Sequence, residues 1–320
     1  MINNFVHLRV QSSYSLLAST IKIPKLIDLA KKNKMQAVAI TDKANLFGSL
    51  EFSIEASKNK IQPIHGMVIN LKYIEDKEKT EFAEILIIAQ NEVGYKNLLK
   101  LSSIPYLQNN RKYYEHISWD DLEKHSKGLI ILSGYTDGPI GKEISKNNIE
   151  VATKLAKKFS SKFGDRFYFE IFRHSERTEI LIEPQYLKLA CDLDIAVVAT
   201  NKVLFEDSKM HDAHDVLLCI AAGVTKDNQN RKFVSNQAYF KSSEEMINLF
   251  RDIPSAIENT IYISQRCSVK AEKHEPMLPG FSSNLTEEEY LRKLATEGLN
   301  ARLANKFNIE NITDKKRRNY

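Results

Sequence analysis

The chain has 320 residues, of which 42% are apolar and 27% charged, the balance of a soluble globular protein. Its net charge of +5 permits contact with nucleic acid without arguing for it, because both signs are interspersed along most of the sequence. No apolar run approaches the roughly 18 residues that span a bilayer, and residues 1–7 carry no cationic leader, so we expect a cytoplasmic protein. Cys191, Cys219 and Cys267 form no CxxC pair, which predicts core thiols rather than a zinc or redox site.

Short apolar runs alternate with amphipathic stretches along the first 220 or so residues. In chain order they predict strand 5–10, helix 24–34, strand 37–40, helix 47–58, strands 61–73 and 83–89, helix 94–107, strand 128–132, helix 149–159, strand 166–172, helix 184–192, strand 195–200 and helix 212–222. Strands that alternate with helices indicate an α/β fold with a parallel sheet or barrel. The number of strands over this length favours a closed barrel.

A domain boundary is predicted near residue 275. A long helical pattern over 256–266 precedes a stretch with two prolines and a glycine, 275–281. A further helix is expected over 286–303, with Thr286 as its N-cap. We therefore expect one domain over 1–275, followed over 276–320 by a linker and the helical start of another domain.

In a parallel barrel the chemistry lies at the carboxyl ends of the strands. A metallohydrolase needs His, Asp, Glu or Cys clustered there. The chain places the cations Arg9, Lys43 and Lys202 at these ends instead. His211 and His214 are spaced for a metal pair on a helix, but a helix start with separately satisfied histidines fits the pattern better. No phosphate-binding glycine loop, nucleophile elbow or HExxH motif is present.

Several separate motifs, in one order and spacing, carry a resemblance to a known family. They are the runs 5–17, 39–48, 63–66, 91–95, 197–201 and 213–220. Together they resemble the N-terminal PHP (polymerase and histidinol phosphatase) region of the bacterial DNA polymerase III alpha subunit, a replicative polymerase. The match covers essentially all 320 residues. The resemblance implies a distorted (β/α)7 barrel, the PHP fold, followed by the start of the polymerase core.

The resemblance also implies that a metal site has been lost. Where metal-bearing members place His-x-His, Asp, His, Glu, His, Cys and Asp-x-His, this chain has Arg9 and Gln11, Ala18, Lys43, Val68, Glu84, Tyr135, and Lys202 and Leu204. Only Glu84 is an ordinary ligand of a hard metal. We therefore expect no metal and no cofactor in this chain. The magnesium of the parent polymerase binds to palm carboxylates that the family places downstream of residue 320.

Three functions follow as hypotheses. The leading one is a catalytically inactive PHP region of a DNA polymerase III alpha subunit, a structural module that docks the proofreading exonuclease subunit and other holoenzyme subunits. The second is a metal-dependent PHP phosphoesterase or proofreading exonuclease. The third is a nonspecific DNA-binding module that uses the basic strand ends and the cluster at 315–318.

The charges at the former ligand positions predict ion pairing. We expect Glu84 to neutralise one or more of Arg9, Lys43 and Lys202, since a buried cation without a partner is costly. Three cations and one acid would leave a positive pocket that attracts phosphate or sulfate, with Asp42 offsetting part of the charge.

Overall fold

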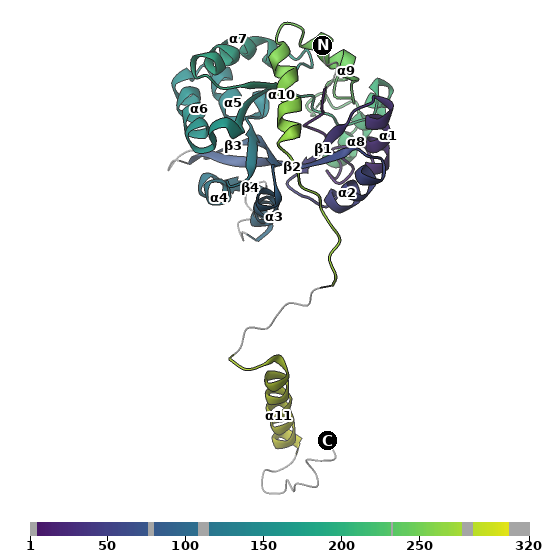
Figure 1. Cartoon of the computed structure of the whole chain (residues 1–320), viewed down its shortest axis with the longest axis vertical. Coiled ribbons are helices and arrows are strands. Elements are labelled where there is room, and N and C mark those ends of the chain that lie inside the picture. The colour runs from purple at the N-terminus through teal and green to yellow at the C-terminus, as the bar shows by residue number, and fades with distance from the viewer. Residues whose placement is uncertain (1–4, 76–79, 108–114, 232, 277–283, 307–320) are drawn as a thin grey trace. The chain divides into compact units, whose positions relative to one another are not determined.

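The computed structural model describes residues 5–75, 80–107, 115–231, 233–276 and 284–306 (Figure 1). The chain divides into two compact units, Met1–Glu272 and Lys273–Tyr320. The basic cluster at 315–318 and most of the expected linker lie outside the described residues.

Eleven α-helices lie in the described part of the chain, and none of them is long and apolar enough to cross a membrane. They are α1 Ile23–Lys32, α2 Ser49–Lys58, α3 Glu92–Leu107, α4 Trp119–Lys124, α5 Pro139–Ser145, α6 Ile149–Phe163, α7 Arg177–Asp192, α8 His211–Ala222, α9 Ser243–Leu249, α10 Pro254–Gln265 and α11 Glu287–Lys306. Each helix predicted from the sequence is confirmed within a few residues except α7, which begins seven residues earlier than expected.

Seven strands form one curled sheet in the first unit. They are β1 Ala37–Lys43, β2 Gln62–Glu75, β3 Thr80–Ala89, β4 His116–Ser118, β5 Leu129–Leu132, β6 Phe167–Ile171 and β7 Val197–Ala199. Their order is β1-β2-β3-β5-β6-β7, and β4 pairs with β2. The expected parallel pairing is confirmed for the other strand pairs but is wrong for β3, which runs antiparallel to both β2 and β5. The reason is the short connection over 76–79, since a parallel pair needs a crossover of a dozen or more residues.

The extended N-terminal segment, residues 5–11, lies between the two ends of this sheet. On one side the amides of Ala39 and Thr41 in β1 donate to the carbonyls of His7 and Val10, at 2.9 and 2.7 Å. On the other side this segment forms a bridge with Val203, just after β7. The predicted strand 5–10 is thus an isolated bridge rather than a full strand. These bonds complete the distorted (β/α)7 barrel that was expected.

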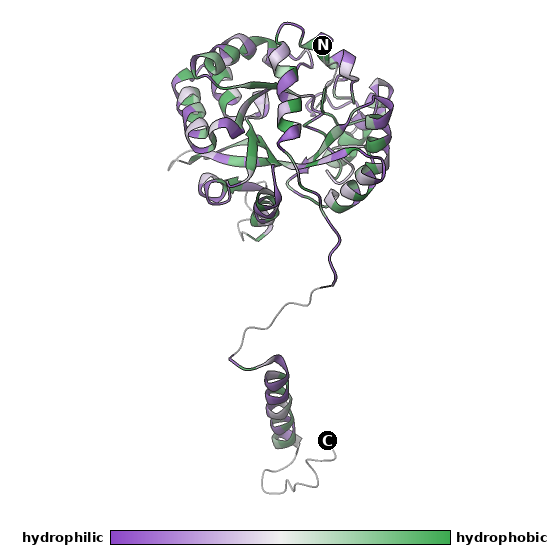
Figure 2. Ribbon diagram, viewed as in Figure 1, coloured by the Kyte–Doolittle hydropathy of each residue, from purple (hydrophilic) through white to green (hydrophobic). Residues whose placement is uncertain are grey.

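Strands β1, β5 and β6 are buried on both faces, as their near-continuous apolar runs predicted. Alternate residues enter two different apolar clusters: Val38 and Ile40 pack with the large cluster that includes residues of the surrounding helices, whereas Ala37 and Ala39 pack in the smaller one. Ile263 of α10 belongs to the smaller cluster. Figure 2 shows the apolar strands inside the first unit and mixed hydropathy on the helices around them.

The prediction of core thiols is confirmed for two of the cysteines and wrong for the third. Cys219 and Cys267 are buried, whereas Cys191 is exposed on α7. On that helix the core-facing positions are Ile182, Tyr186 and Leu189, so the 3.6-residue period places Cys191 away from the core.

Candidate functional site

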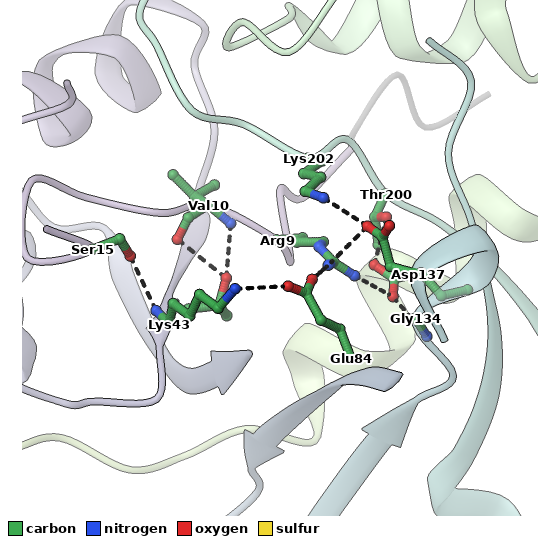
Figure 3. A network of polar contacts seen from close by, with 11 residues as sticks. Arg9, Val10, Ser15, Lys43, Glu84, Gly134, Asp137, Thr200 and Lys202 are labelled. Carbon is green, nitrogen blue, oxygen red and sulfur yellow. Dashed lines mark hydrogen bonds and ion pairs between the residues drawn. The ribbon is translucent and has the colours of Figure 1, made fainter. Parts of the chain in front are cut away.

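A buried arginine, Arg9, stands among the nine positions where the resemblance to the PHP family places metal ligands, called here the former ligand positions (Figure 3). The Arg9 side chain is fully buried. Its Nη2 donates to Oε2 of Glu84 at 3.0 Å, and its Nη1 donates to Oε2 of Glu170 at 2.9 Å. One guanidinium therefore links two carboxylates from different strands, a geometry that suits its planar fork of donors.

Two lysines extend this arrangement on either side of Arg9 (Figure 3). Lys43 Nζ lies 3.1 Å from Oε1 of Glu84, and Lys202 Nζ lies 2.6 Å from Oδ2 of Asp137. Asp137 Oδ2 is also 3.9 Å from Nη2 of Arg9. We call these six residues the salt-bridge cluster: Arg9, Lys43, Glu84, Asp137, Glu170 and Lys202.

The barrel topology explains why these distant residues meet. Lys43 ends β1, Glu170 lies in the second half of β6, and Lys202 follows β7, so they come from the carboxyl ends of parallel strands. Glu84 lies in the first half of β3, which reaches the same end of the barrel because that strand runs antiparallel. Asp137 ends the short 3₁₀ helix η1, Tyr135–Asp137, which follows β5.

Glu170 is fixed by more than the arginine. Thr200 Oγ1 donates to its Oε1 at 2.7 Å, and the amide of Gly134 donates to its Oε2 at 3.1 Å. Gly134 has a φ of +81°, and a Cβ there would lie 2.0 Å from the carbonyl oxygen of Glu84. Only glycine fits this position without a shift of the backbone. The Glu170 carboxylate, which is fully buried, therefore has both oxygens satisfied.

The charges of the cluster shift the pKa values of Glu84, Asp137 and Lys202 toward their ionised forms. Burial acts to raise the pKa of Glu84, but Lys202, Arg9 and Lys43 outweigh it and hold that pKa well below its usual range. Burial likewise opposes ionisation of Asp137, and Lys202 reverses the effect, so its pKa is also lowered. The pKa of Lys202 is raised by Asp137 and Glu84 against the effect of burial.

The expected positive pocket is therefore not what the structure shows. Asp137 and Glu170 join Glu84, so three carboxylates face three cations and the charges balance within the described residues. Asp42 forms no ion pair with these cations among the described residues; its oxygens accept from the amide and hydroxyl of Ser12 and from the hydroxyl of Ser15. The predicted anion pocket of Arg9, Lys43 and Lys202 depended on a net positive charge, and the three carboxylates cancel that charge.

The other former ligand positions are built into the fold rather than into a site. Val68 and Leu204 are buried in apolar clusters. Tyr135 packs edge-on against Phe172 and Tyr186. Its hydroxyl donates to a backbone carbonyl of α7 at 3.2 Å.

Two former ligand positions remain. Gln11 is buried, and its backbone N–H donates to the carbonyl of Val203 at 3.0 Å. Ala18 is half-buried, and its backbone carbonyl accepts a hydrogen bond from Nε2 of His214. Neither side chain forms a hydrogen bond or ion pair with the salt-bridge cluster in the part of the chain that the structure describes.

The two histidines of α8 do not form a metal pair. His211 Nε2 lies 3.0 Å from the carbonyl of Val234, and His214 Nε2 lies 2.8 Å from the carbonyl of Ala18. Because a carbonyl only accepts, each Nε2 carries the hydrogen, and each ring anchors a different loop. This outcome agrees with separately satisfied histidines at a helix start.

The sequence alone revealed neither Asp137 nor Glu170 as a partner of these cations. Asp137 lies in η1, beyond the end of β5, and its distance from any predicted strand gave no signal. A charge count would have given such a signal, because three cations at neighbouring strand ends, one of them fully buried, require more than the single acid among the nine positions.

Comparisons with known proteins agree with this architecture. The PHP domain family matches residues 7–174, just over half of the chain. The DNA polymerase III subunit alpha of Rickettsia bellii is 54% identical over 314 residues, which cover 98% of this chain and 26% of that protein. Its counterpart from Caulobacter vibrioides is 40% identical over 304 residues, covering 93% of this chain and 27% of that protein. The chain thus spans about a quarter of the length of these relatives.

Among solved structures, a two-domain protein containing a predicted PHP-like metal-dependent phosphoesterase, from Bacteroides vulgatus, is 10% identical with a TM-score of 0.36. The alignment covers 86% of this chain and 72% of that one. So distant a likeness bears no weight here. Because the match to the PHP domain family extends over more than half of the chain, this chain belongs to that family.

Proposed function

We propose that this chain is the catalytically inactive PHP region of a bacterial DNA polymerase III alpha subunit, where it acts as a structural module. The observation that carries the proposal is Arg9. Its guanidinium is fully buried where metal-bearing relatives would hold a ligand, and it is bound to Glu84 and Glu170. A divalent cation placed beside it would meet a fixed positive charge in a medium of low dielectric.

The competing function is a metal-dependent phosphoesterase or exonuclease. It would need several His, Asp, Glu or Cys ligands converging on one point. At the nine former positions the carboxylate of Glu84 is already neutralised by Arg9 and Lys43. To bind a metal it would have to give up both pairs, so the geometry favours the inactive module.

The proposed setting is the replicative holoenzyme in the cytoplasm. The relatives named DNA polymerase III subunit alpha support it, and the resemblance implies that this region docks the proofreading exonuclease subunit. Magnesium would serve the parent polymerase domain. Mixing the purified chain with the exonuclease subunit and measuring association by isothermal titration calorimetry tests the docking role. We expect a complex. If titration shows no heat and the two proteins do not co-elute in size-exclusion chromatography, the docking role is wrong and only the structural role stands.

The metal content is the first prediction. After dialysis against excess Mn²⁺ or Zn²⁺ and then metal-free buffer, elemental analysis should find fewer than two ions per chain, with no hydrolysis of a phosphodiester above background. Cations at the former ligand positions prevent a multi-metal cluster from assembling. Two or more ions per chain, lost when Glu84 is changed to Gln, would overturn the proposal.

DNA synthesis is the second prediction. Primer extension by this chain with magnesium and all four nucleotides should stay at the level of a no-enzyme control. The polymerase reaction needs paired carboxylates that hold Mg²⁺, and the resemblance places them outside these 320 residues. A further chromatographic step that removes any polymerase of the expression host is the control. Extension that survives this control would contradict the assignment of the chain to the PHP region alone.

Nonspecific DNA binding remains the third function to test. Because the salt-bridge cluster is neutral, its lysines are not free to bind phosphates. A titration with duplex DNA at increasing salt measures how many phosphate contacts form. Weak binding that vanishes near physiological salt is the expected result.

A further inference from the structure

A second group of possible metal ligands lies between the end of β6 and the start of α7. One nitrogen of His174 and one carboxylate oxygen each of Glu176 and Glu179 lie within 4.8 Å of one another. None of the three belongs to the nine former ligand positions or to the salt-bridge cluster. His174 and Glu179 are buried, whereas Glu176 is exposed.

The hydrogen bonds around His174 fix which of its nitrogens is free. Asn201 donates through Nδ2 to the carbonyls of Gln237 and Tyr239, so its Oδ1 is the acceptor that faces His174 Nε2 at 2.8 Å. The hydrogen of the neutral ring is therefore on Nε2, and Nδ1 keeps its lone pair. Among the described residues Nδ1 has no hydrogen-bond partner. A histidine whose other nitrogen donates to an amide oxygen is oriented in the way that metal ligands usually are.

The Glu179 carboxylate gives an independent sign of a missing partner. Its Oε2 accepts from the amides of His174 and Glu176, at 2.7 and 3.2 Å. Its Oε1 is buried without a hydrogen-bond partner in the part of the chain that the structure describes. The residue is only 2% exposed. A buried carboxylate oxygen without a donor or a cation is costly, and most native proteins satisfy such atoms.

The nearby cations are engaged elsewhere. Lys241 donates to Asn201 Oδ1 at 3.3 Å and to the carbonyl of Gln237. Arg173 is held by Glu183 and Asp252. Neither forms an ion pair with Glu176 or Glu179 among the described residues.

A surface cavity borders this group at Glu179. Glu179 lines a cavity of about 470 Å³, together with Arg173, Ser175 and Leu249 among others. The cavity leaves room for water molecules to complete the coordination of an ion. Glu176 is exposed, so its side chain can close by the ångström or so that metal–ligand bonds of about 2.0–2.2 Å would need.

We propose that His174, Glu176 and Glu179 bind one divalent first-row cation, with water as the remaining ligands. One imidazole and two carboxylates suit the borderline ions Zn²⁺ and Mn²⁺. The ion neutralises the two carboxylates and ties the end of β6 to the start of α7. It is a single ion at a separate place, so it does not restore the lost cluster and does not depend on the proposed function.

Calorimetric titration of the metal-free chain with ZnSO₄ tests the proposal. One ion per chain is expected. Glu179→Gln and His174→Ala should each weaken binding at least about tenfold, the scale of effect seen even for residues that only support a ligand. His274→Ala is the matched control, because His274 is exposed outside this group and should leave affinity unchanged.

Glu176→Gln separates loss of a metal ligand from loss of the fold. Glu176 is exposed, so this variant should keep the melting temperature of the metal-free wild type while binding zinc about tenfold more weakly. A manganese titration followed by electron paramagnetic resonance repeats the comparison with the second ion. Absence of binding in the wild type, or equal affinity in wild type, Glu176→Gln and Glu179→Gln, would overturn the proposal.

Discussion

Replacing Arg9 by methionine is expected to lower the free energy of unfolding by about 3–5 kcal/mol, the usual cost of breaking a buried ion pair from one side. Methionine fills much of the same volume but cannot donate to Glu84 or Glu170. Glu170 is fully buried, and the hydroxyl of Thr200 and the amide of Gly134 would be its remaining donors. Urea denaturation followed by circular dichroism measures the change.

Lys43→Met is the matched control for Arg9→Met. Lys43 also pairs with Glu84, but its side chain is 41% exposed, so the pair is screened by water and its loss should cost less than about 1 kcal/mol. The single variant Glu170→Gln and the double variant Arg9→Met, Glu170→Gln complete a double-mutant cycle. The cycle isolates the coupling energy between Arg9 and Glu170. If Arg9→Met and Lys43→Met proved equally mild, the salt-bridge cluster would not be what holds this end of the barrel together.

The local elements could be predicted from the sequence because their signals are local. The apolar run of β3 and the amphipathic period of α1 each depend only on neighbouring residues. The helix was predicted to begin at Pro184, but this proline lies inside α7, and prolines are more usual in the first turn of a helix. The true start carries glutamates at the N-cap Glu176 and at Glu179, a capping pattern that lacks the usual serine or threonine.

The candidate site was harder to predict because it depends on strand direction. Glu84 lies at the mouth of the barrel only because β3 runs antiparallel, and that direction follows from the short connection before it. Asp137 reaches Arg9 from a 3₁₀ helix rather than from a strand. The ion pairing of Glu84 with Arg9 and Lys43 was foreseen and is observed, but the balance of charge was not.

The Glu84→Gln variant should be destabilised at pH 7 by about 1–3 kcal/mol, the cost of leaving hydrogen-bonding and charged partners unsatisfied. Arg9 would keep Glu170, and Lys43 would turn to solvent, which is why the loss is smaller than for Arg9→Met. Lys202→Met is the companion variant. Its partner Asp137 is 36% exposed and can be hydrated, so that loss should be mild, below about 1 kcal/mol.

The pH dependence separates charge from packing in this comparison. The pKa of Glu84 is lower in the folded chain than its ordinary value of 4.5. A carboxylate of this kind contributes stability that is fully present above the unfolded pKa and is lost as the pH falls through the folded one. Wild type should therefore lose stability below about pH 4.5 more steeply than Glu84→Gln, and the gap between them should narrow as acid is added. Thermal melts from pH 7 to pH 3 decide the matter. A constant gap across this range would assign the effect to packing, and a variant that melts like the wild type at pH 7 would show that the pairing of Glu84 contributes nothing to the fold.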